Sequence, residues 1–443
     1  MSDLAKRVLI AKTHGQLNHE LPIMFYEPWA ADKRALWSAW LADNSVPAAL
    51  RKTLGLYIHV PYCTQVCSFC YLEKRLLDST VPSFVDVLIE EVDQMAPLFK
   101  GHPFRTLYLG GGTPGSLTVA QLDRLFSRLK DAFDLRSLAE FSLETDLPSL
   151  TEDKLRCYQE HGLTRLSVGL QNLDPTVLAQ NNRLHQYDIE GKMGLLEAYR
   201  FRDLNLDVIL GIPGSHLDNL EQTITRALAI RPTRISLYTF NPYEGYDFDY
   251  GDDEAVALLV ESRRAQQALA KSLIQDAEEA GLLGNRDNLQ LDDTMRLHSP
   301  LLGLGPSANN RMPFHGYYKN ADSYAYLENS EQITGWKSNG ADEELEFHVY
   351  NSLIRNLPID LRQSRALLNR LPSEIHAIVT AKLGDQLRFE DGRLVRNVQN
   401  DVQMHLALLK ALDVTRNNLD AIDFPQSLEG LDEDRLLDVL IGY

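Results

Sequence analysis

Segments with strand character alternate with segments of helical character between residues 54 and 240, and this alternation limits the possible folds most strongly. The strand-like segments are Leu54–Val60, Arg105–Gly110, Glu140–Glu144, Arg165–Leu170, Leu206–Gly211 and Arg234–Thr239. The helical segments between them are Val81–Leu98, Thr118–Phe133, Thr151–Glu160, Ile189–Arg202 and Asn219–Ala229, with Thr118 and Thr151 at N-cap positions. Strands and helices that alternate in this way form parallel sheets with right-handed crossovers. The sequence therefore predicts an α/β fold, a barrel or a doubly wound sheet, whose chemistry lies at the carboxyl ends of the strands.

Three cysteines directly follow the first predicted strand. Cys63, Cys67 and Cys70 have the spacing C-x3-C-x2-C, while the fourth cysteine of the chain, Cys157, lies far away in a helical segment. Clustered thiolates favour an iron–sulfur cluster or zinc over hard cations. With three ligands nearby, a [4Fe–4S] cluster would keep one iron open for a substrate or cofactor. A Cys3His zinc site that uses His59 is the alternative, because zinc accepts that ligand set.

The composition narrows the class of protein. A length of 443 residues fits about two to three domains, and the formal net charge of −18 argues against general affinity for nucleic acids. Four cysteines in so long a chain do not form a disulfide framework and fit a reducing compartment. No apolar run approaches the roughly 18 residues that a membrane span needs. We therefore expect a soluble, cytoplasmic and monomeric protein without a nucleic-acid or membrane partner.

The cysteine motif and its surroundings resemble a known family. C-x3-C-x2-C with an aromatic residue, Phe69, just before the last cysteine resembles the signature of the radical S-adenosylmethionine (radical SAM) superfamily. Residues Tyr57–Cys63 (YIHVPYC) resemble the HemN-like branch, which is typified by oxygen-independent coproporphyrinogen III oxidase. That branch also includes heme chaperones, anaerobic heme-degrading enzymes and SAM-dependent C-methyltransferases.

The resemblance implies a cofactor and a fold. The three cysteines would bind a [4Fe–4S] cluster whose open iron holds SAM, and reductive cleavage of SAM would give a 5′-deoxyadenosyl radical. An electron donor such as flavodoxin or ferredoxin would supply the electron, and a small molecule would be the substrate. We therefore expect a partial (βα)6 TIM-type barrel that carries this site.

Polar and glycine-rich segments at the ends of the predicted strands match the SAM-binding segments of the family. Alone, each has an ordinary explanation: the GGGTP segment Gly110–Pro114 would be a tight turn, Glu144 a solvated loop charge and Arg183 a surface cation. A carboxylate inside an apolar strand, as at Asp207, is seldom buried without a partner, and Arg183 is a plausible one. By resemblance, the expected SAM contacts are Tyr57, Phe69, Gly111, Gly112, Thr113, Glu144, Gln171, Arg183, Asp207, Asn241 and Asn309.

Two further units flank the barrel, which we place at residues 54–330. Residues 1–53 contain an extended aromatic stretch, Pro22–Trp29, and a short helical pattern, Lys33–Leu41, and they would form a strap on the barrel or a lid over the cluster. Residues 331–443 contain two helical patterns and then Asp391-Gly392 between two alternating runs, which is a strong hairpin signal. This order predicts a winged-helix-like α+β domain, which by resemblance covers the barrel opening.

The residue two positions after Cys70 helps to distinguish between the reactions known in this branch of the family. Oxygen-independent coproporphyrinogen III oxidases typically have a fourth cysteine there, whereas this chain has Leu72, and its N-terminal region is longer than in heme chaperones. The C-methyltransferase branch keeps three cysteines, and its second-SAM residues correspond to Gly112, Gln171, Arg183 and Asp207. We therefore favour an alkylating enzyme that uses two SAM molecules on an unsaturated small molecule, with cyclopropane formation as a variant. The alternatives are tetrapyrrole oxidation, anaerobic heme degradation and heme chaperoning.

Overall fold

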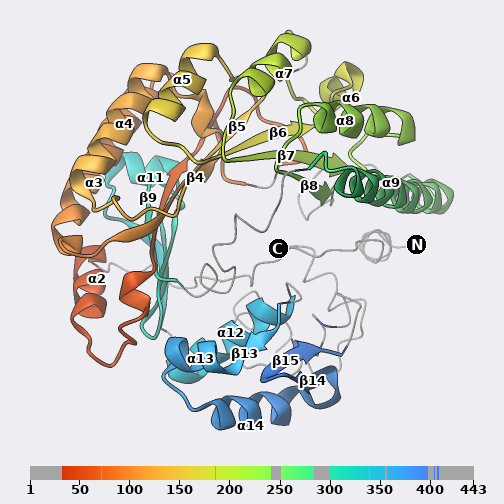
Figure 1. The fold of residues 1–443 in the computed structure, drawn as a ribbon. Coiled ribbons are helices and arrows are strands. Elements are labelled where there is room, and N and C mark those ends of the chain that lie inside the picture. The colour runs from red at the N-terminus through yellow and green to blue at the C-terminus, as the bar shows by residue number, and fades with distance from the viewer. Residues whose placement is uncertain are drawn as a thin grey trace.

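The computed structural model describes residues 32–70, 72–184, 186–240, 251–283, 299–338, 340–354 and 357–397, together with residues 404, 407 and 408. A curved sheet carries helices on its convex side, and a smaller domain lies opposite its concave side (Figure 1). The helices are α2 (Lys33–Ala42), α3 (Val81–Met95), α4 (Val119–Ala132), α5 (Glu152–Glu160), α6 (Pro175–Gln180), α7 (Ile189–Ala198), α8 (Leu217–Ala229), α9 (Asp253–Glu279), α11 (Ser323–Glu328), α12 (Ala341–Ile354), α13 (Leu361–Leu368) and α14 (Pro372–Leu383). None of the helices in this part of the chain has the length and apolar character needed to cross a membrane.

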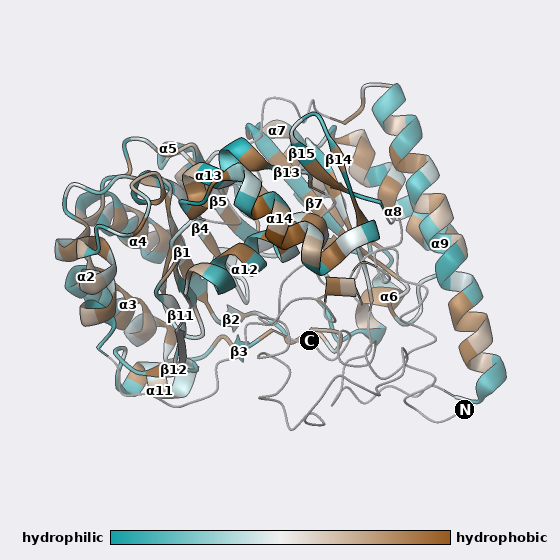
Figure 2. Cartoon of the chain, turned by 90° about the horizontal axis from the view of Figure 1, so that it is seen from below, coloured by the Kyte–Doolittle hydropathy of each residue, from teal (hydrophilic) through white to brown (hydrophobic). Residues whose placement is uncertain are grey.

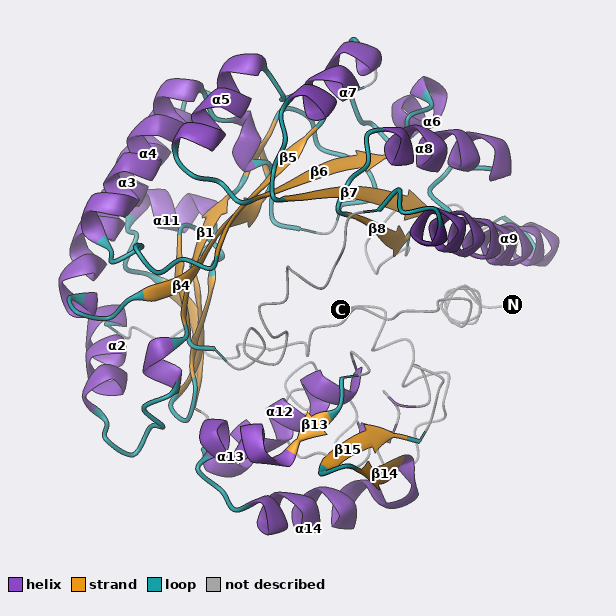
Figure 3. Cartoon of the chain, viewed as in Figure 1, coloured by secondary structure: helices purple, strands orange, loops and turns teal. Residues whose placement is uncertain are grey.

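The main sheet has ten strands in the order β12-β11-β10-β9-β1-β4-β5-β6-β7-β8. Its strands are β1 (Leu54–Val60), β4 (Phe104–Gly111), β5 (Glu140–Asp146), β6 (Arg165–Gln171), β7 (Asp203–Leu210), β8 (Arg234–Thr239), β9 (Leu301–Leu304), β10 (Asn309–Met312), β11 (Gly316–Asn320) and β12 (Ile333–Ser338). The six strands from β1 to β8 in this order are parallel, β9 adds a parallel strand to β1, and β10 to β12 continue antiparallel. The sheet curves without pairing its two edge strands (Figure 3), which confirms the expected partial (βα)6 TIM-type barrel.

Side chains alternate between the two faces of each parallel strand. Leu56 and Ile58 of β1 and Leu109 of β4 belong to the fully buried apolar core that packs against the helices. The residues between them, such as Tyr57 and Tyr108, face the concave side. The same alternation puts polar and charged side chains on that side of β5, β6, β7 and β8: Glu140, Ser142, Glu144, Arg165, Ser167, Asp203, Asn205, Asp207, Arg234 and Ser236. The interior of closed TIM barrels is instead filled mainly with branched aliphatic residues.

Most predicted elements match the structure. The bounds of β1 and β8 are those expected, and the side chains of Thr118 and Thr151 cap α4 and α5. The fifth parallel strand begins at Asp203, three residues before the predicted start, and α7 ends at Ala198 instead of Arg202. Residues Asp203–Leu206 alternate between polar and apolar, and this signal for the start of the strand was missed because the prediction followed the more continuous apolar run that begins at Leu206. No prediction had been made for α9 or α6.

The described part of the N-terminal region packs as a strap against the antiparallel part of the sheet. Trp37 and Trp40 of α2 are fully buried. The indole N–H of Trp37 donates to the Tyr318 hydroxyl at 3.0 Å, and that of Trp40 donates to the Pro313 carbonyl at 2.9 Å. The predicted extended stretch Pro22–Trp29 lies outside the described residues.

The C-terminal unit combines α12, α13 and α14 with a three-stranded sheet of β13 (Ile359–Asp360), β15 (Arg393–Arg396) and β14 (Leu387–Glu390). Asp391 and Gly392 have φ values of 49° and 81° in the turn between β14 and β15, which confirms the hairpin. Glu344 of α12 forms a buried ion pair with Arg311 of β10 and joins this unit to the barrel. Seen from below, α12, α13 and α14 lie over the barrel strands (Figure 2). The α+β character is as expected, and the winged-helix likeness remains a prediction.

Candidate functional site

The three clustered cysteines lie on a loop at the carboxyl end of β1. Two short parallel strands, β2 (Tyr62–Cys63) and β3 (Arg75–Leu76), close this loop, and the Leu77 N–H donates to the Cys63 carbonyl at 2.9 Å. Inside the loop, the Cys70 N–H donates to the Cys67 carbonyl at 3.2 Å. None of the three cysteines forms a disulfide bond, and all three are half-buried. The backbone therefore holds the three sulfur atoms in one compact segment.

Two other predicted segments meet this loop. The Thr113 hydroxyl donates to the Cys63 sulfur at 3.4 Å, and the Arg183 guanidinium donates to the Cys67 sulfur at the same distance. The Asn182 side chain donates to the Val66 carbonyl at 2.7 Å and fixes the Arg183 loop beside the cysteines. The structure thus brings together the cysteine motif, the GGGTP turn and Arg183, which lie far apart in the sequence.

The surroundings of Cys63 and Cys70 favour the neutral thiol when no cation is bound. Burial raises the pKa of Cys63 to about 11 and also raises the pKa of Cys70. Metal ligation requires deprotonated thiols, so a bound cationic centre would supply the compensating charge. Hydrogen bonds to the sulfur atoms from Thr113 and Arg183 would add to this stabilisation.

The zinc alternative finds no matching ligand set. His59 shares a hydrogen bond of 3.1 Å between its Nδ1 and the Tyr57 hydroxyl. Its Nε2 faces the next strand: a Cβ added to Gly111 would lie 2.7 Å from it. Within the described residues, no group of three or more His, Cys, Asp or Glu side chains, the three cysteines included, lies at metal-binding distances. What bears on the Cys3His alternative is therefore His59, whose ring is held by Tyr57 and packed against Gly111.

The glycines of the GGGTP turn are required by close packing. Gly111 has φ of 109°, and a Cβ added to Gly112 would lie 2.6 Å from the Pro61 carbonyl oxygen. The Gly112 N–H donates to the Val60 carbonyl at 2.8 Å, and the Thr113 N–H donates to the Tyr62 carbonyl at the same distance. These contacts place Thr113 against Cys63. The predicted contact of this turn with SAM remains a prediction.

Glu144 and Asp207 lie on the concave face of neighbouring parts of the sheet. Glu144 accepts a hydrogen bond from the Tyr108 hydroxyl, and burial raises the pKa of Glu144 to about 7. Asp207 accepts from the Ser167 hydroxyl at 3.0 Å and from the Asn205 side-chain amide at 2.7 Å. Burial raises the pKa of Asp207 despite these hydrogen bonds. Both carboxyl groups are thus held by neighbours that the sequence analysis did not single out.

Gln171 has the most strained backbone of the predicted site. It follows a bulge in the pairing of β6 with β7 and has φ of 64°, a value that residues other than glycine rarely adopt. Its side-chain oxygen is buried and has no hydrogen-bond partner among the residues that the structure describes. Arg183 lies beside it and donates to the Gly169 carbonyl at 2.6 Å. A buried, unpaired acceptor beside a cation suits a site that takes up a polar ligand.

The other predicted contacts are less closely gathered. The Tyr57 ring lies 6.0 Å from the Tyr108 ring, so it belongs to the same concave cluster as Glu144. Phe69 packs against a small apolar cluster of Val177, Ile212 and Phe240. Asn309 is exposed at the start of β10, and Asn241 lies outside the described residues.

Several residues at the site were missed. Tyr108, Ser167 and Asn205 contact the two carboxylates directly. Their signal in the sequence is the placement of polar side chains at every second position of otherwise apolar strands.

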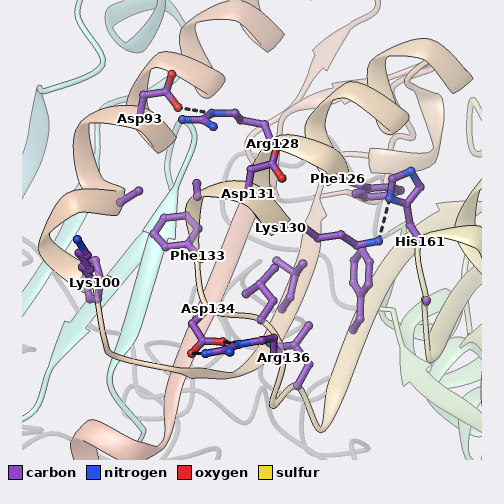
Figure 4. A pocket seen from close by; sticks show the side chains of 18 of the residues that line it. Asp93, Lys100, Phe126, Arg128, Lys130, Asp131, Phe133, Asp134, Arg136 and His161 are labelled. Carbon is purple, nitrogen blue, oxygen red and sulfur yellow. Dashed lines mark hydrogen bonds and ion pairs between the residues drawn. The ribbon is translucent and has the colours of Figure 1, made fainter.

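A separate cleft of about 860 Å³ lies away from this site (Figure 4). Leu107, Phe141 and Thr164 in its lining come from the amino-terminal parts of β4 and β5 and from the residue before β6. The cysteine loop lies at the opposite, carboxyl ends of the strands. In the cleft, Arg128 pairs with Asp93. None of the residues that line the cleft belongs to the cysteine site, so the two sites are separate.

Comparisons with known proteins agree with this placement. Residues 57–227 match the model of the radical SAM superfamily. The chain is 32% identical over 194 residues to oxygen-independent coproporphyrinogen III oxidase from Escherichia coli (strain K12), covering 43% of this chain and 42% of that protein. It is 27% identical over 192 residues to the heme chaperone HemW from Lactococcus lactis subsp. lactis (strain IL1403), covering 43% of this chain and 50% of that protein. The matched region thus spans half or less of the length of these two relatives.

A solved structure extends the likeness of the fold. Coproporphyrinogen III oxidase (HemN) from Escherichia coli superposes with a TM-score of 0.68 at 21% identity, covering 93% of this chain and 99% of that chain. At this identity the likeness concerns the fold alone, and it supports the α/β architecture with a partial TIM-type barrel.

Proposed function

Because this chain belongs to the HemN-like family of the radical SAM superfamily, we propose that it is a radical SAM enzyme that acts on a tetrapyrrole. The observation that carries the proposal is the meeting of Cys63, Cys67 and Cys70 with Thr113 and Arg183 at the carboxyl end of β1. The substrate class rests on the relatives, which are named for a coproporphyrinogen or for heme.

These relatives favour the tetrapyrrole alternative over the two-SAM alkylating reaction that we predicted from the cysteine motif. The prediction depended on Leu72, which stands where oxygen-independent coproporphyrinogen III oxidases typically have a fourth cysteine. The lack of that cysteine removes one argument for an oxidase but is no evidence for alkylation. Gly112, Gln171, Arg183 and Asp207 suit SAM in either reaction.

The family implies a [4Fe–4S] cluster and SAM, and the residues present fit both. The three cysteine thiols would hold the cluster, with the Thr113 hydroxyl and the Arg183 guanidinium donating to two of the sulfur atoms. When bound, the cluster and SAM supply the radical chemistry of the superfamily. Hydrogen bonds and charges at the sulfur atoms tune the reduction potential of such a cluster.

The concave face would bind and orient the cofactor and the substrate. Glu144 and Asp207 would accept hydrogen bonds from SAM, and the unpaired oxygen of Gln171 offers a further acceptor. Arg183, between the cysteines and Gly169, would attract the carboxylate of the cofactor. The C-terminal unit opposite the concave side would limit access of water. The proposal includes an electron donor of the flavodoxin or ferredoxin type that reduces the cluster. It also includes that the protein acts as a monomer.

The test uses the anaerobically reconstituted protein, reduced with dithionite and incubated with SAM. We would quantify 5′-deoxyadenosine and S-adenosylhomocysteine by mass spectrometry, with coproporphyrinogen III or heme added separately. Formation of 5′-deoxyadenosine that rises with one tetrapyrrole, together with consumption of that tetrapyrrole, is the expected result. Both products without dependence on a tetrapyrrole would point back to alkylation, and bound heme without turnover would point to a chaperone.

Cysteine variants test which thiols bind the cluster, with Cys157 as the control outside the loop. The triple variant Cys63→Ala, Cys67→Ala, Cys70→Ala should lose iron–sulfur absorbance and all formation of 5′-deoxyadenosine. Cys157→Ala should retain both, because Cys157 is buried on α5 away from the loop. Full iron–sulfur absorbance in the triple variant would show that the site is wrongly assigned.

A further inference from the structure

We infer that Tyr108 is a positioning residue for SAM binding, whose hydroxyl holds one oxygen of Glu144 so that the carboxylate keeps the orientation in which it bonds the cofactor. The inference rests on the proposed function, because it assumes that Glu144 contacts SAM. Tyr108 belongs to no sequence motif that we identified, and it reaches the site only through Glu144.

The sheet register brings the two residues together. Tyr108 lies on β4 and Glu144 on β5, and these neighbouring parallel strands pair at Leu109 and Leu143. The residues next to each of these, Tyr108 and Glu144, then face the concave side. The Tyr108 hydroxyl donates to Oε1 of Glu144. One oxygen of the carboxylate is therefore fixed from the neighbouring strand.

The other carboxylate oxygen is held against the backbone of the glycine turn. A Cβ added to Gly110 would lie 3.0 Å from Oε2 of Glu144, 2.9 Å from the Tyr108 ring and 3.2 Å from the Tyr57 ring. The nearby Gly111 N–H also favours the ionised form of Glu144 and opposes the rise of its pKa. Glycine at position 110 thus makes room for three side chains. Tyr108 both packs at this position and donates a hydrogen bond to the carboxylate.

The charges around Glu144 give the inference a distinct pH dependence. Burial raises the pKa of Glu144 to about 7, and the hydrogen bond from Tyr108 opposes this shift. An ionised carboxylate accepts hydroxyl hydrogen bonds more strongly than a protonated one. Loss of the Tyr108 hydroxyl should therefore raise the pKa of Glu144 and move the loss of SAM binding to higher pH. The groups that face Glu144 are Tyr108 of β4, the Gly111 N–H, Arg165 of β6, Asp207 of β7 and Tyr238 of β8.

The variant Tyr108→Phe tests the inference, with Tyr326→Phe as its matched control. Tyr326 also donates its hydroxyl to a buried glutamate, Glu91, at 2.7 Å, but this pair lies between α11 and α3. We expect Tyr108→Phe to raise the KM for SAM about tenfold, as loss of a hydrogen bond to a charged group would. The acid limb of kcat/KM against pH should move to higher pH. Tyr326→Phe should lower the melting temperature and leave both SAM parameters unchanged.

An unchanged KM and pH profile in folded Tyr108→Phe would overturn the inference. So would equal shifts in the two tyrosine variants, since these would reflect a structural effect. If Tyr108→Phe does not fold, Tyr108→Met carries the test, because it removes the hydroxyl and keeps an apolar side chain of similar length. A KM for SAM raised about tenfold, as expected for Tyr108→Phe, would support the inference, and an unchanged KM would overturn it.

A double-mutant cycle separates this inference from the proposed function. If Tyr108 acts through Glu144, the double variant Tyr108→Phe, Glu144→Gln should have the same KM for SAM as Glu144→Gln alone. If Glu144→Gln leaves the KM unchanged, the proposed contact between Glu144 and SAM is wrong. If Glu144→Gln raises the KM but Tyr108→Phe does not, only the role of Tyr108 is wrong. SAM cleavage without a tetrapyrrole provides the rate, so an error in the substrate class does not affect the result.

Discussion

Glu91 and Glu144 both accept hydrogen bonds from tyrosine hydroxyls, and their surroundings differ. Glu91 of α3 is 1% exposed and forms an ion pair with Lys33 of α2. It also accepts from the Tyr326 hydroxyl and from the Gly305 N–H at 2.8 Å. Its two oxygens are thus occupied by groups from separate elements, which explains how one carboxylate ties the N-terminal helix to the barrel.

Glu144 has fewer hydrogen-bond partners than Glu91, and its pKa is raised. Within the described residues its hydrogen-bond donor is the Tyr108 hydroxyl, and no salt bridge reaches it. Burial without a paired cation raises its pKa to about 7, so both protonation states are populated near neutral pH. The comparison teaches that the number of hydrogen-bond donors around a carboxylate distinguishes its role. A carboxylate whose two oxygens both have several donors supports the fold, and one with few donors is available to a ligand. Perturbed titration in a concave, partly open position is typical of functional sites.

Removal of Glu91 should have the largest effect on stability. Glu91→Ala leaves the buried ammonium of Lys33 without its partner, and breaking a buried ion pair in this way costs about 3–5 kcal/mol. We expect the free energy of unfolding in denaturant to fall by that amount, while the folded fraction keeps its KM for SAM. A loss similar to that of an exposed ion pair, such as Arg124 with Asp86, would show that Glu91 is not a structural anchor.

Removal of Arg183 should have the largest effect on activity. Arg183→Ala deletes the donors to the Cys67 sulfur and the Gly169 carbonyl but none of the thiol ligands. We expect the iron content and absorbance of the cluster to persist and the rate of SAM cleavage to fall about 100-fold, the loss of about two hydrogen bonds of a charged group. Normal cleavage by this variant would show that Arg183 has no part in binding SAM.

The parts of the fold that sequence patterns predicted are those in which one residue in two is apolar. The alternation in β1 and β8 marks their ends correctly, because the outward residues pack on the helices. In β7 the inward residues Asp203 and Asn205 are polar, and the predicted strand begins three residues late although Leu204 and Leu206 alternate with them. The start of a strand is therefore predicted less well where half of its residues are polar and an apolar run follows.

The candidate site also contains some residues that the sequence predicted and others that it did not. The cysteine spacing and the glycine turn are local motifs, so resemblance located them. The pairing of Tyr108 with Glu144 depends on the register between two strands that lie 36 positions apart at these residues. No short-range pattern contains that register. The donors to Asp207 were missed for the same reason, since Ser167 lies on the neighbouring strand.

Replacement of Glu144 by glutamine should make stability less dependent on pH. The pKa of Glu144 is raised from 4.5 to about 7 in the folded protein, so between these values the native state binds a proton that the unfolded state has released. The contribution of this group to stability is therefore full at low pH and is lost as the pH rises through about 7. Glu144→Gln should gain stability relative to the wild type between about pH 5 and about pH 8. Denaturant unfolding at both pH values measures this, and an unchanged difference would mean that Glu144 titrates normally.

The smallest effect is expected where a carboxylate has redundant donors. Asp207 accepts from both Ser167 and Asn205, so Ser167→Ala leaves the 2.7 Å hydrogen bond from Asn205 in place. We expect the KM for SAM to rise less than about threefold, compared with about tenfold for Tyr108→Phe, because the remaining donor still orients the carboxylate. Ser142→Ala is the matched control, since Ser142 donates to Glu140 at 2.5 Å nearer the amino ends of the strands. An effect of Ser167→Ala as large as that of Tyr108→Phe would mean that Asn205 alone does not hold Asp207, and that Asp207 depends on a single donor as Glu144 does.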